Sequence, residues 1–222
     1  MAKTKRIAFV TIGQAPRIDL VPEILERLDG DVETQEFGAL DDLSHEEIAE
    51  MHPPADERSL CTRLRDGSEV VIGKRQTQAR LQELIDRLDS QGFDAITLLC
   101  TGYFPELHSQ RTLFIEAQRV VDATVDALSL GCRNLGVMVP LERQIAESHV
   151  KSTDERRITG SYYSPYAEDR LEQATRELKD CDLIVMHCMG YNEAMRARAA
   201  EVVDKPILLA RRIVAGAVQQ LL

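Results

Sequence analysis

Two stretches of the chain are nearly the same: DAITLLCTGY (residues 94–103) and DLIVMHCMGY (residues 182–191). In each, an aspartate precedes a cysteine by six positions across a mainly apolar run, and a Gly-Tyr pair follows one residue after the cysteine. Short runs of consecutive apolar residues are typical of parallel strands that are covered on both faces. Each copy therefore predicts a buried strand that ends at a cysteine, Cys100 or Cys188, and continues into a turn.

The likeness extends beyond these two stretches. A helical segment precedes each copy, RLQELIDRL (80–88) before the first and RLEQATREL (170–178) before the second. The strand KRIAFVTI from Lys5 likewise resembles RNLGVMVP from Arg133. The same elements in the same order predict two similar α/β halves that face each other. No low-complexity linker separates them, so we expect the halves to pack together.

Short apolar runs alternate with helical periodicity along the whole chain, which predicts an α/β fold with mainly parallel sheets. The predicted strands are 7–12, 32–37, 69–72, 95–99, 135–139, 183–187 and 207–209. The predicted helices are 17–28, 77–90, 111–129, 141–149, 167–179, 192–203 and 211–222. An Asp-Gly pair within 63–74 suggests a hairpin, and Ser164-Pro165 has the form of a helix start.

Composition excludes several classes of partner. The 222 residues carry a formal net charge of −10, and the basic residues are scattered, which argues against nucleic acid or an anionic membrane surface. No apolar stretch approaches the roughly 20 residues that span a bilayer. Five widely spaced cysteines, an odd number, fit a reducing compartment better than a disulfide framework. We therefore expect a cytoplasmic protein; the sequence leaves a homo-oligomer open.

The two cysteines suggest a ligand site. In open α/β sheets, ligands bind beyond the carboxyl ends of the strands, where Cys100 and Cys188 are placed. We expect a helix to follow each turn, and its N-terminus would lower the thiol pKa from ~8.5 and offer N–H donors to a carboxylate. The glycine of each turn would let a ligand approach the backbone.

Two thiols facing each other across a cleft suit one reaction class. One thiolate removes a proton from a carbon next to a carboxylate, and the other thiol returns a proton to the opposite face, without metal or cofactor. A covalent role would need only one nucleophilic cysteine. The simpler alternative is that buried cysteines act as small apolar residues, which is what we expect of Cys61, Cys132 and Cys181.

Other residues near the predicted strand ends are weaker candidates. The stretch TIGQAPR (11–17) is a third strand-end turn, and its arginine suits a carboxylate, although such arginines are often only solvated. The threonine after Cys100 suits a substrate oxygen or a helix cap. The two repeat tyrosines line the cleft or only support the turn, and GSYYSPY (160–166) forms a lid or surface packing. The candidate substrate-binding residues are Thr11, Gly13, Gln14, Arg17, Thr101, Gly102, Tyr103, Met189, Gly190 and Tyr191.

A metal site is not expected. Cys181, His187 and Cys188 lie close in sequence, but their spacing matches no usual zinc pattern, and strand alternation points His187 away from Cys188. The chain also has no G-x-G-x-x-G, Walker A, G-x-S-x-G or H-E-x-x-H motif. We predict neither a metal nor an organic cofactor.

The chain resembles the AroM family over nearly its whole length. The likeness rests on TIGQAPR, FGALDDLS (37–44), RLRDG (63–67), the two cysteine turns and PILLARR (206–212). No reaction is established for that family, so the resemblance implies a fold and a site but not an activity.

More distantly, the paired turns resemble the aspartate/glutamate/hydantoin racemase superfamily, in which two pseudo-symmetric halves each supply a cysteine. The resemblance implies that Cys100 and Cys188 are the catalytic pair, and that the backbone N–H groups of residues 101–102 and 189–190 hold a carboxylate. It also implies that the C-terminal helix returns to the first half, giving halves of 1–120 plus 205–222 and of 121–204.

The chain departs from that superfamily at two places. Amino-acid racemases of this group often follow the second cysteine with Thr-His, where this chain has Met189-Gly190, and often carry an acidic residue in the first turn, which TIGQAPR lacks. The expected function is a cofactor-independent racemase, epimerase or isomerase of a small carboxylate or hydantoin-like ring amide. The alternative is a protein that binds a small anion without turning it over.

Overall fold

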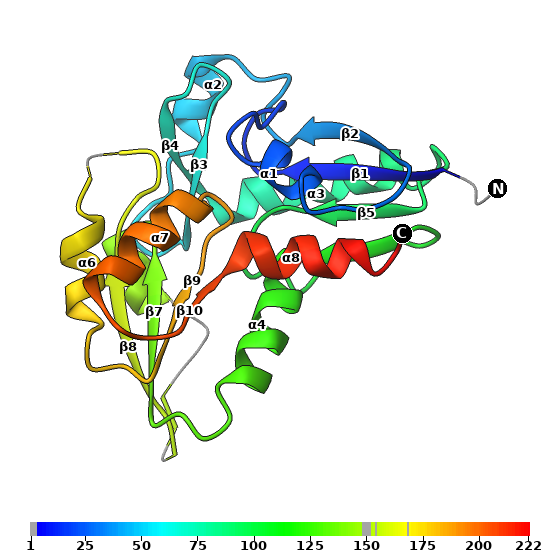
Figure 1. Cartoon of the computed structure of the whole chain (residues 1–222). Helices are drawn as coiled ribbons and strands as arrows, with labels where there is room; N and C mark the ends of the chain where they lie inside the picture. Colours follow the sequence, from blue (N-terminus) through cyan, green and yellow to red (C-terminus); the bar gives the residue numbers. More distant parts are fainter. Residues whose placement is uncertain (1–3, 148–151, 154, 168) are drawn as a thin grey trace.

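The computed structural model describes residues 4–147, 152–153, 155–167 and 169–222. It contains two four-stranded parallel sheets (Figure 1). The first has the order β2-β1-β5-β6, formed by Val32–Gly38, Lys5–Thr11, Ala95–Leu98 and Leu113–Glu116. The second has the order β8-β7-β9-β10, formed by Arg157–Tyr162, Asn134–Val139, Leu183–Met186 and Ile207–Leu209. The prediction of two similar α/β halves with mainly parallel sheets is confirmed.

The repeat holds at the level of single residues. Ile7 pairs with Ala95 in the first sheet, and Leu135 pairs with Leu183 at the same place in the second. The repeated aspartates have a structural role there: Asp94 accepts a hydrogen bond from the Arg6 backbone N–H at 2.9 Å. Asp182 accepts bonds from the N–H groups of Arg133 and Asn134 at 2.7 and 2.9 Å. Each aspartate thus fixes its strand against the neighbouring central strand.

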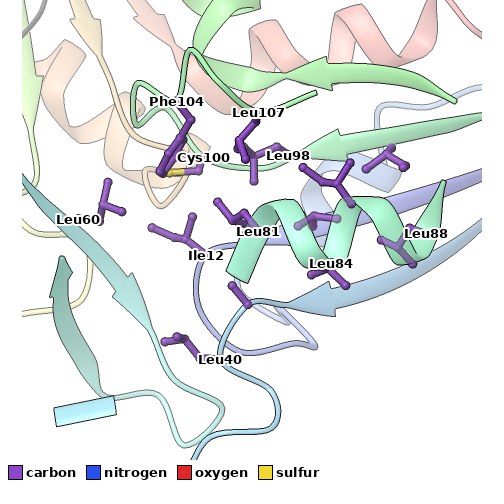
Figure 2. Close-up of a cluster of buried hydrophobic side chains, with 14 of the residues drawn as sticks. Ile12, Leu40, Leu60, Leu81, Leu84, Leu88, Leu98, Cys100, Phe104 and Leu107 are labelled. Carbon is purple, nitrogen blue, oxygen red and sulfur yellow. The ribbon is translucent and has the colours of Figure 1, made fainter. Parts of the chain in front are cut away.

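Eight helices lie in the described residues. They are α1 Val21–Leu25, α2 His45–Glu50, α3 Lys74–Leu88, α4 Ala117–Leu128, α5 Glu142–Glu147, α6 Leu171–Glu177, α7 Glu193–Val202 and α8 Ala210–Gln219. Helix α3 packs its apolar face on the first sheet, where Leu81, Leu84 and Leu88 join a buried cluster that has Cys100 at one end (Figure 2). Leucines at helical spacing form such a face because positions three and four apart lie on one side of a helix.

A central hydrophobic cluster joins the two halves. It contains residues of β1 and α1 from the first half, β7 and β9 from the second, and the helices α4 and α8. Helix α8 packs against α4 and α1, while β10, which leads directly into it, pairs with β9 (Figure 1). The predicted boundaries between the halves stay a prediction: β10 pairs with β9 of the second sheet, whereas α8 packs on α1 of the first half and on α4.

A β-hairpin projects from the first half. Strands β3 (Ser59–Arg63) and β4 (Glu69–Gly73) pair antiparallel around the Asp-Gly turn, where Gly67 has φ +94°. Helix α5 of the second half contacts this hairpin: Gln144 donates to the Ser59 carbonyl at 3.1 Å, and Glu147 accepts the Ser59 N–H at 2.8 Å. The hairpin therefore connects one half of the molecule to the other.

Several local predictions were wrong. Strands β3, β6 and β8 and helix α2 were not predicted. The helix predicted over 111–129 begins only at Ala117, because Leu113–Glu116 forms β6. Ser164-Pro165 does not start a helix, since α6 begins at Leu171. The last residues of the helix predicted over 141–149 lie outside the described residues. No helix in the described part of the chain is long and apolar enough to cross a membrane.

Candidate active site

Both repeated cysteines line one cavity of about 330 Å³ at the carboxyl ends of the central strands. Eight of the twelve residues predicted for the site line it, namely Arg17, Cys100, Thr101, Gly102, Tyr103, Cys188, Met189 and Gly190. The cavity lining does not include Thr11, Gly13, Gln14 and Tyr191. The fold thus brings the two turns together, 88 residues apart in the chain.

The two cysteine turns have the same local geometry. The Gly102 N–H donates to Cys100 Sγ at 3.3 Å, and the Gly190 N–H donates to Cys188 Sγ at 3.3 Å. Among the described residues, the backbone N–H groups of Thr101 and Met189 have no hydrogen-bond partner. These two donors belong to residues that line the cavity, where a ligand oxygen can accept from them.

Burial dominates the titration of both thiols. It raises the pKa of Cys100 to about 12 and that of Cys188 to about 11, although the glycine N–H groups and the Arg17 charge favour the thiolates. The expected help from a following helix is absent at Cys100, whose turn leads through a loop to β6. Helix α7 begins only at Glu193, five residues after Cys188. At neutral pH both thiols are therefore protonated.

Arg17 is the buried cation of the site. Its guanidinium pairs with Asp19 at 2.7 Å and donates to Tyr166 Oη at 2.9 Å and to Thr11 Oγ1 at 3.1 Å. Although burial opposes its charge, the bond to Asp19 raises the pKa of Arg17 overall, and Arg17 lowers the pKa of Asp19. The positive charge lies close enough to lower the pKa of both cysteine thiols. Thr11 thus contacts Arg17 rather than the cavity.

Three of the other predicted residues have structural contacts. Gln14 donates to the Leu40 carbonyl at 3.3 Å and accepts the Arg65 N–H at 2.9 Å. At Gly13 an added Cβ would lie 2.6 Å from the Arg63 carbonyl oxygen of the hairpin. Gly190 likewise has no room for a side chain, because a Cβ there would lie 2.3 Å from Tyr166 Oη. These glycines make room for neighbouring segments of the protein.

The two repeat tyrosines have different environments. Tyr103 lines the cavity and is 39% exposed, with the Lys74 ammonium 5.7 Å from its ring centroid. Tyr191 is fully buried, donates to the Tyr163 carbonyl at 2.6 Å and stacks on the Tyr163 ring. Only the first tyrosine is placed to contact a ligand.

Sequence reasoning missed several residues of the site. Tyr166 and Cys61 line the cavity, Cys61 Sγ donating to Glu69 Oε2 at 3.3 Å, and burial strongly raises the pKa of each. Arg211 of α8 is buried and donates to the Met189 carbonyl at 3.0 Å, so it holds the second cysteine turn. Tyr166 was within the quoted tyrosine loop, but nothing in the sequence signalled Cys61 or Arg211 as members of the site.

His187 and Asp122 form a polar pair in the same cavity. His187 Nε2 and Asp122 Oδ1 are 2.8 Å apart, and both residues line the cavity. His187 and Cys188 thus line the same cavity, although strand alternation predicted that His187 points away from Cys188. No group of three or more His, Cys, Asp or Glu residues in the described ranges is arranged to hold a metal ion.

Solved structures with the same architecture are distant in sequence. A maleate cis-trans isomerase of Nocardia farcinica with a covalently bound succinylcysteine intermediate has a TM-score of 0.58 at 15% identity, covering 98% of this chain and 92% of that one. The allantoin racemase of Klebsiella pneumoniae has a TM-score of 0.57 at 14% identity, covering 98% and 87%. The aspartate racemase of Picrophilus torridus has a TM-score of 0.58 at 10% identity, covering 97% and 93%. A search of curated proteins found no significant match.

The two halves, each with a four-stranded parallel sheet, give this chain the same fold as the allantoin racemase and aspartate racemase structures. Within that fold class, the family model described as AroM protein matches residues 7–222. The chain belongs to the AroM family.

Proposed function

We propose that this protein is a cofactor-independent racemase, epimerase or isomerase that moves a proton between Cys100 and Cys188 across a small carboxylate or ring-amide substrate. The observation that carries the proposal is the matched pair of thiols, each held by a glycine N–H at 3.3 Å, in one cavity. Allantoin racemase and aspartate racemase, two of the structures with this fold, support the same class.

The two thiols take unequal roles in the first step. Cys188 has the lower pKa of the two, about 11, and its thiolate is favoured by both Arg17 and Arg211. Once Cys188 has lost its own proton to solvent, its thiolate removes the proton from the carbon next to the carboxylate, and the electron pair of the C–H bond delocalises into the substrate. The Cys100 S–H then donates its proton to the opposite face, leaving a Cys100 thiolate. In the reverse direction the roles exchange.

The backbone provides the substrate anchor in this proposal. The unpaired N–H groups of Thr101 and Met189, one in each turn, donate to the carboxylate and stabilise the charge that develops on it. Arg17 is already paired with Asp19, so it acts by favouring the thiolates rather than by clamping the substrate.

The test is hydrogen exchange in D₂O with a panel of amino acids, hydroxy acids and hydantoins, followed by proton NMR. We expect loss of the signal at the acidic carbon with wild type, and a decrease of about 10²-fold or more in Cys100→Ser and in Cys188→Ser. Cys132→Ser, a partly exposed cysteine that does not line the cavity, is the matched control. Hydrogen exchange that persists when Cys100→Ser and Cys188→Ser are combined would contradict the two-thiol mechanism.

The raised thiol pKa values favour one second candidate, a protein that binds a small anion without turning it over. In that case a carboxylate raises the melting temperature, is recovered unchanged and shows no exchange at any pH. Replacing either cysteine by serine would then leave ligand affinity nearly unchanged, whereas the anchoring turns would still be required.

A further inference from the structure

The cavity extends well beyond the cysteine turns. Cys188 follows the carboxyl end of β9, whereas Arg156, which also lines the cavity, immediately precedes the first residue of β8. Since β8 and β7 are parallel, Arg156 lies at the amino ends of these strands. Leu135 and Val139 of β7 both line the cavity and are four residues, or about 13 Å, apart along a strand. The cavity therefore runs along the second sheet.

The wall of this extension is apolar. Alternate residues of a strand share one face, so Leu135, Val137 and Val139 of β7 all face the cavity, as does Val185 of β9. Val125 of α4 lies in the same lining and completes it from the opposite side. All five belong to the central hydrophobic cluster. We call this set, residues 125, 135, 137, 139 and 185, the apolar channel.

Charged groups in this part of the cavity are paired with each other. Arg156 and Asp126 form an ion pair at 3.0 Å, and His187 lies 2.8 Å from Asp122. A small polar acid that occupied only the cysteine turns would leave the apolar channel unfilled. The cavity volume of about 330 Å³ lies at the lower end of the range of about 300–1,000 Å³ that is typical of small-molecule sites.

We propose that the substrate is an amphiphilic acid, whose carboxylate or ring amide is held at the cysteine turns and whose aryl or alkyl substituent occupies the apolar channel. The inference rests on the proposed function for the reacting group, but the channel itself requires only binding. Removing an apolar substituent from water against these valines and the leucine supplies the affinity that the carboxylate alone does not.

The test uses non-reacting probes: acetate, butyrate, hexanoate, octanoate and 4-phenylbutyrate, titrated by calorimetry. With wild type, each added CH₂ should strengthen binding by about fourfold until the channel is filled. We expect 4-phenylbutyrate to bind at least a hundredfold more tightly than acetate, since two added CH₂ groups contribute about sixteenfold and the phenyl ring roughly tenfold or more. Equal affinities across the series would overturn the inference, and this measurement needs no variant.

Two phenylalanine variants of α4 test whether the higher affinity for 4-phenylbutyrate arises in the apolar channel. Val125→Phe places a ring in the channel, whereas Leu128→Phe adds the same ring at a position that is 58% exposed and outside the lining. The 4-phenylbutyrate advantage should fall to about threefold or less in Val125→Phe and stay at the wild-type value in Leu128→Phe. An unchanged advantage in a folded Val125→Phe would show that the tail binds elsewhere and overturn the assignment.

The outcomes separate this inference from the proposed function. Strong 4-phenylbutyrate binding with no D₂O exchange for any acid supports the channel and refutes the isomerase. Exchange that is equally fast for alanine and phenylglycine, with no gain along the fatty-acid series, supports the isomerase and overturns the amphiphilic substrate.

Discussion

At the level of single residues, burial of Cys100 and Cys188 outweighs the local contacts that stabilise their thiolates. Each cysteine accepts one N–H bond and lies within reach of Arg17, yet its pKa rises because the thiolate loses more solvation than these contacts return. The negative charge of a bound carboxylate would oppose ionisation of the two thiols further. The backbone N–H groups that hold the carboxylate are therefore needed to offset its charge. Without a ligand charge nearby, both thiols are thus neutral at pH 7.

This predicts a steep pH dependence of thiol reactivity. Because burial raises the pKa of Cys188 to about 11, the thiolate fraction increases about tenfold per pH unit from pH 7 to 10. Alkylation of Cys188 by iodoacetamide, followed by peptide mass spectrometry, should show that slope, with N-acetylcysteine as the reference thiol and circular dichroism verifying the fold. A rate that is already constant above pH 8 would mean that the thiol is far more acidic than its burial implies.

At the level of elements, the repeated aspartates show how one motif serves the fold and the site together. Asp182 accepts two backbone N–H bonds at the start of β7, and Asp94 accepts one from Arg6 at the start of β1. Both contacts fix a cysteine-bearing strand in register with its central neighbour. This register fixes the position of the cysteine that follows each aspartate by six residues, just beyond the carboxyl end of the strand.

Asp182→Ala should therefore lower the melting temperature at neutral pH. The N–H groups of Asn134 and Arg133 lower the pKa of Asp182 below its ordinary 3.8. A lowered folded-state pKa means that the stabilisation is complete above pH 3.8 and is lost as the pH falls through the folded value. The difference from wild type should shrink in acid melting curves. Asp204→Ala, whose exposed side chain has no ion pair or hydrogen bond among the described residues, should show no such trend.

At the level of the whole molecule, the hairpin β3–β4 closes the site by linking the halves. It contributes Cys61 to the cavity lining, and it is tied to α5 by Glu147 and Gln144. Arg143 adds a bond to the Glu57 carbonyl at 2.7 Å. The cavity is therefore lined by segments from both halves and by the hairpin that connects them.

Glu147→Ala should loosen the hairpin without unfolding either sheet. It removes the acceptor of both the Ser59 N–H and hydroxyl, at 2.8 and 3.0 Å, and the partner of Arg143. Amide hydrogen exchange should accelerate in residues 57–73 and stay unchanged in β1 and β5. Glu142→Ala, an exposed position on the same helix, is the control. Equal protection of the hairpin in both variants would show that Glu147 does not hold it.

The sequence by itself determined the repeat and its consequences. The two ten-residue repeats predicted two strands, two turns, the equivalence of Cys100 and Cys188, and two similar halves. This was possible because periodicity and turn residues are local properties of a chain. Short strands such as Leu113–Glu116 escaped prediction, since four residues carry too little pattern to distinguish a strand from the helix that follows.

Only the tertiary structure decided which residues meet at the site and how they titrate. Cys61 of the hairpin lines the cavity, and Arg211 of the C-terminal helix binds the second cysteine turn. Tyr191 is buried in the core and does not line the cavity, although it is equivalent to Tyr103 in the repeat. The thiol pKa values followed the burial that packing of both halves imposes, not the turn sequence. Burial and charge proximity depend on contacts between distant segments, which no local pattern specifies.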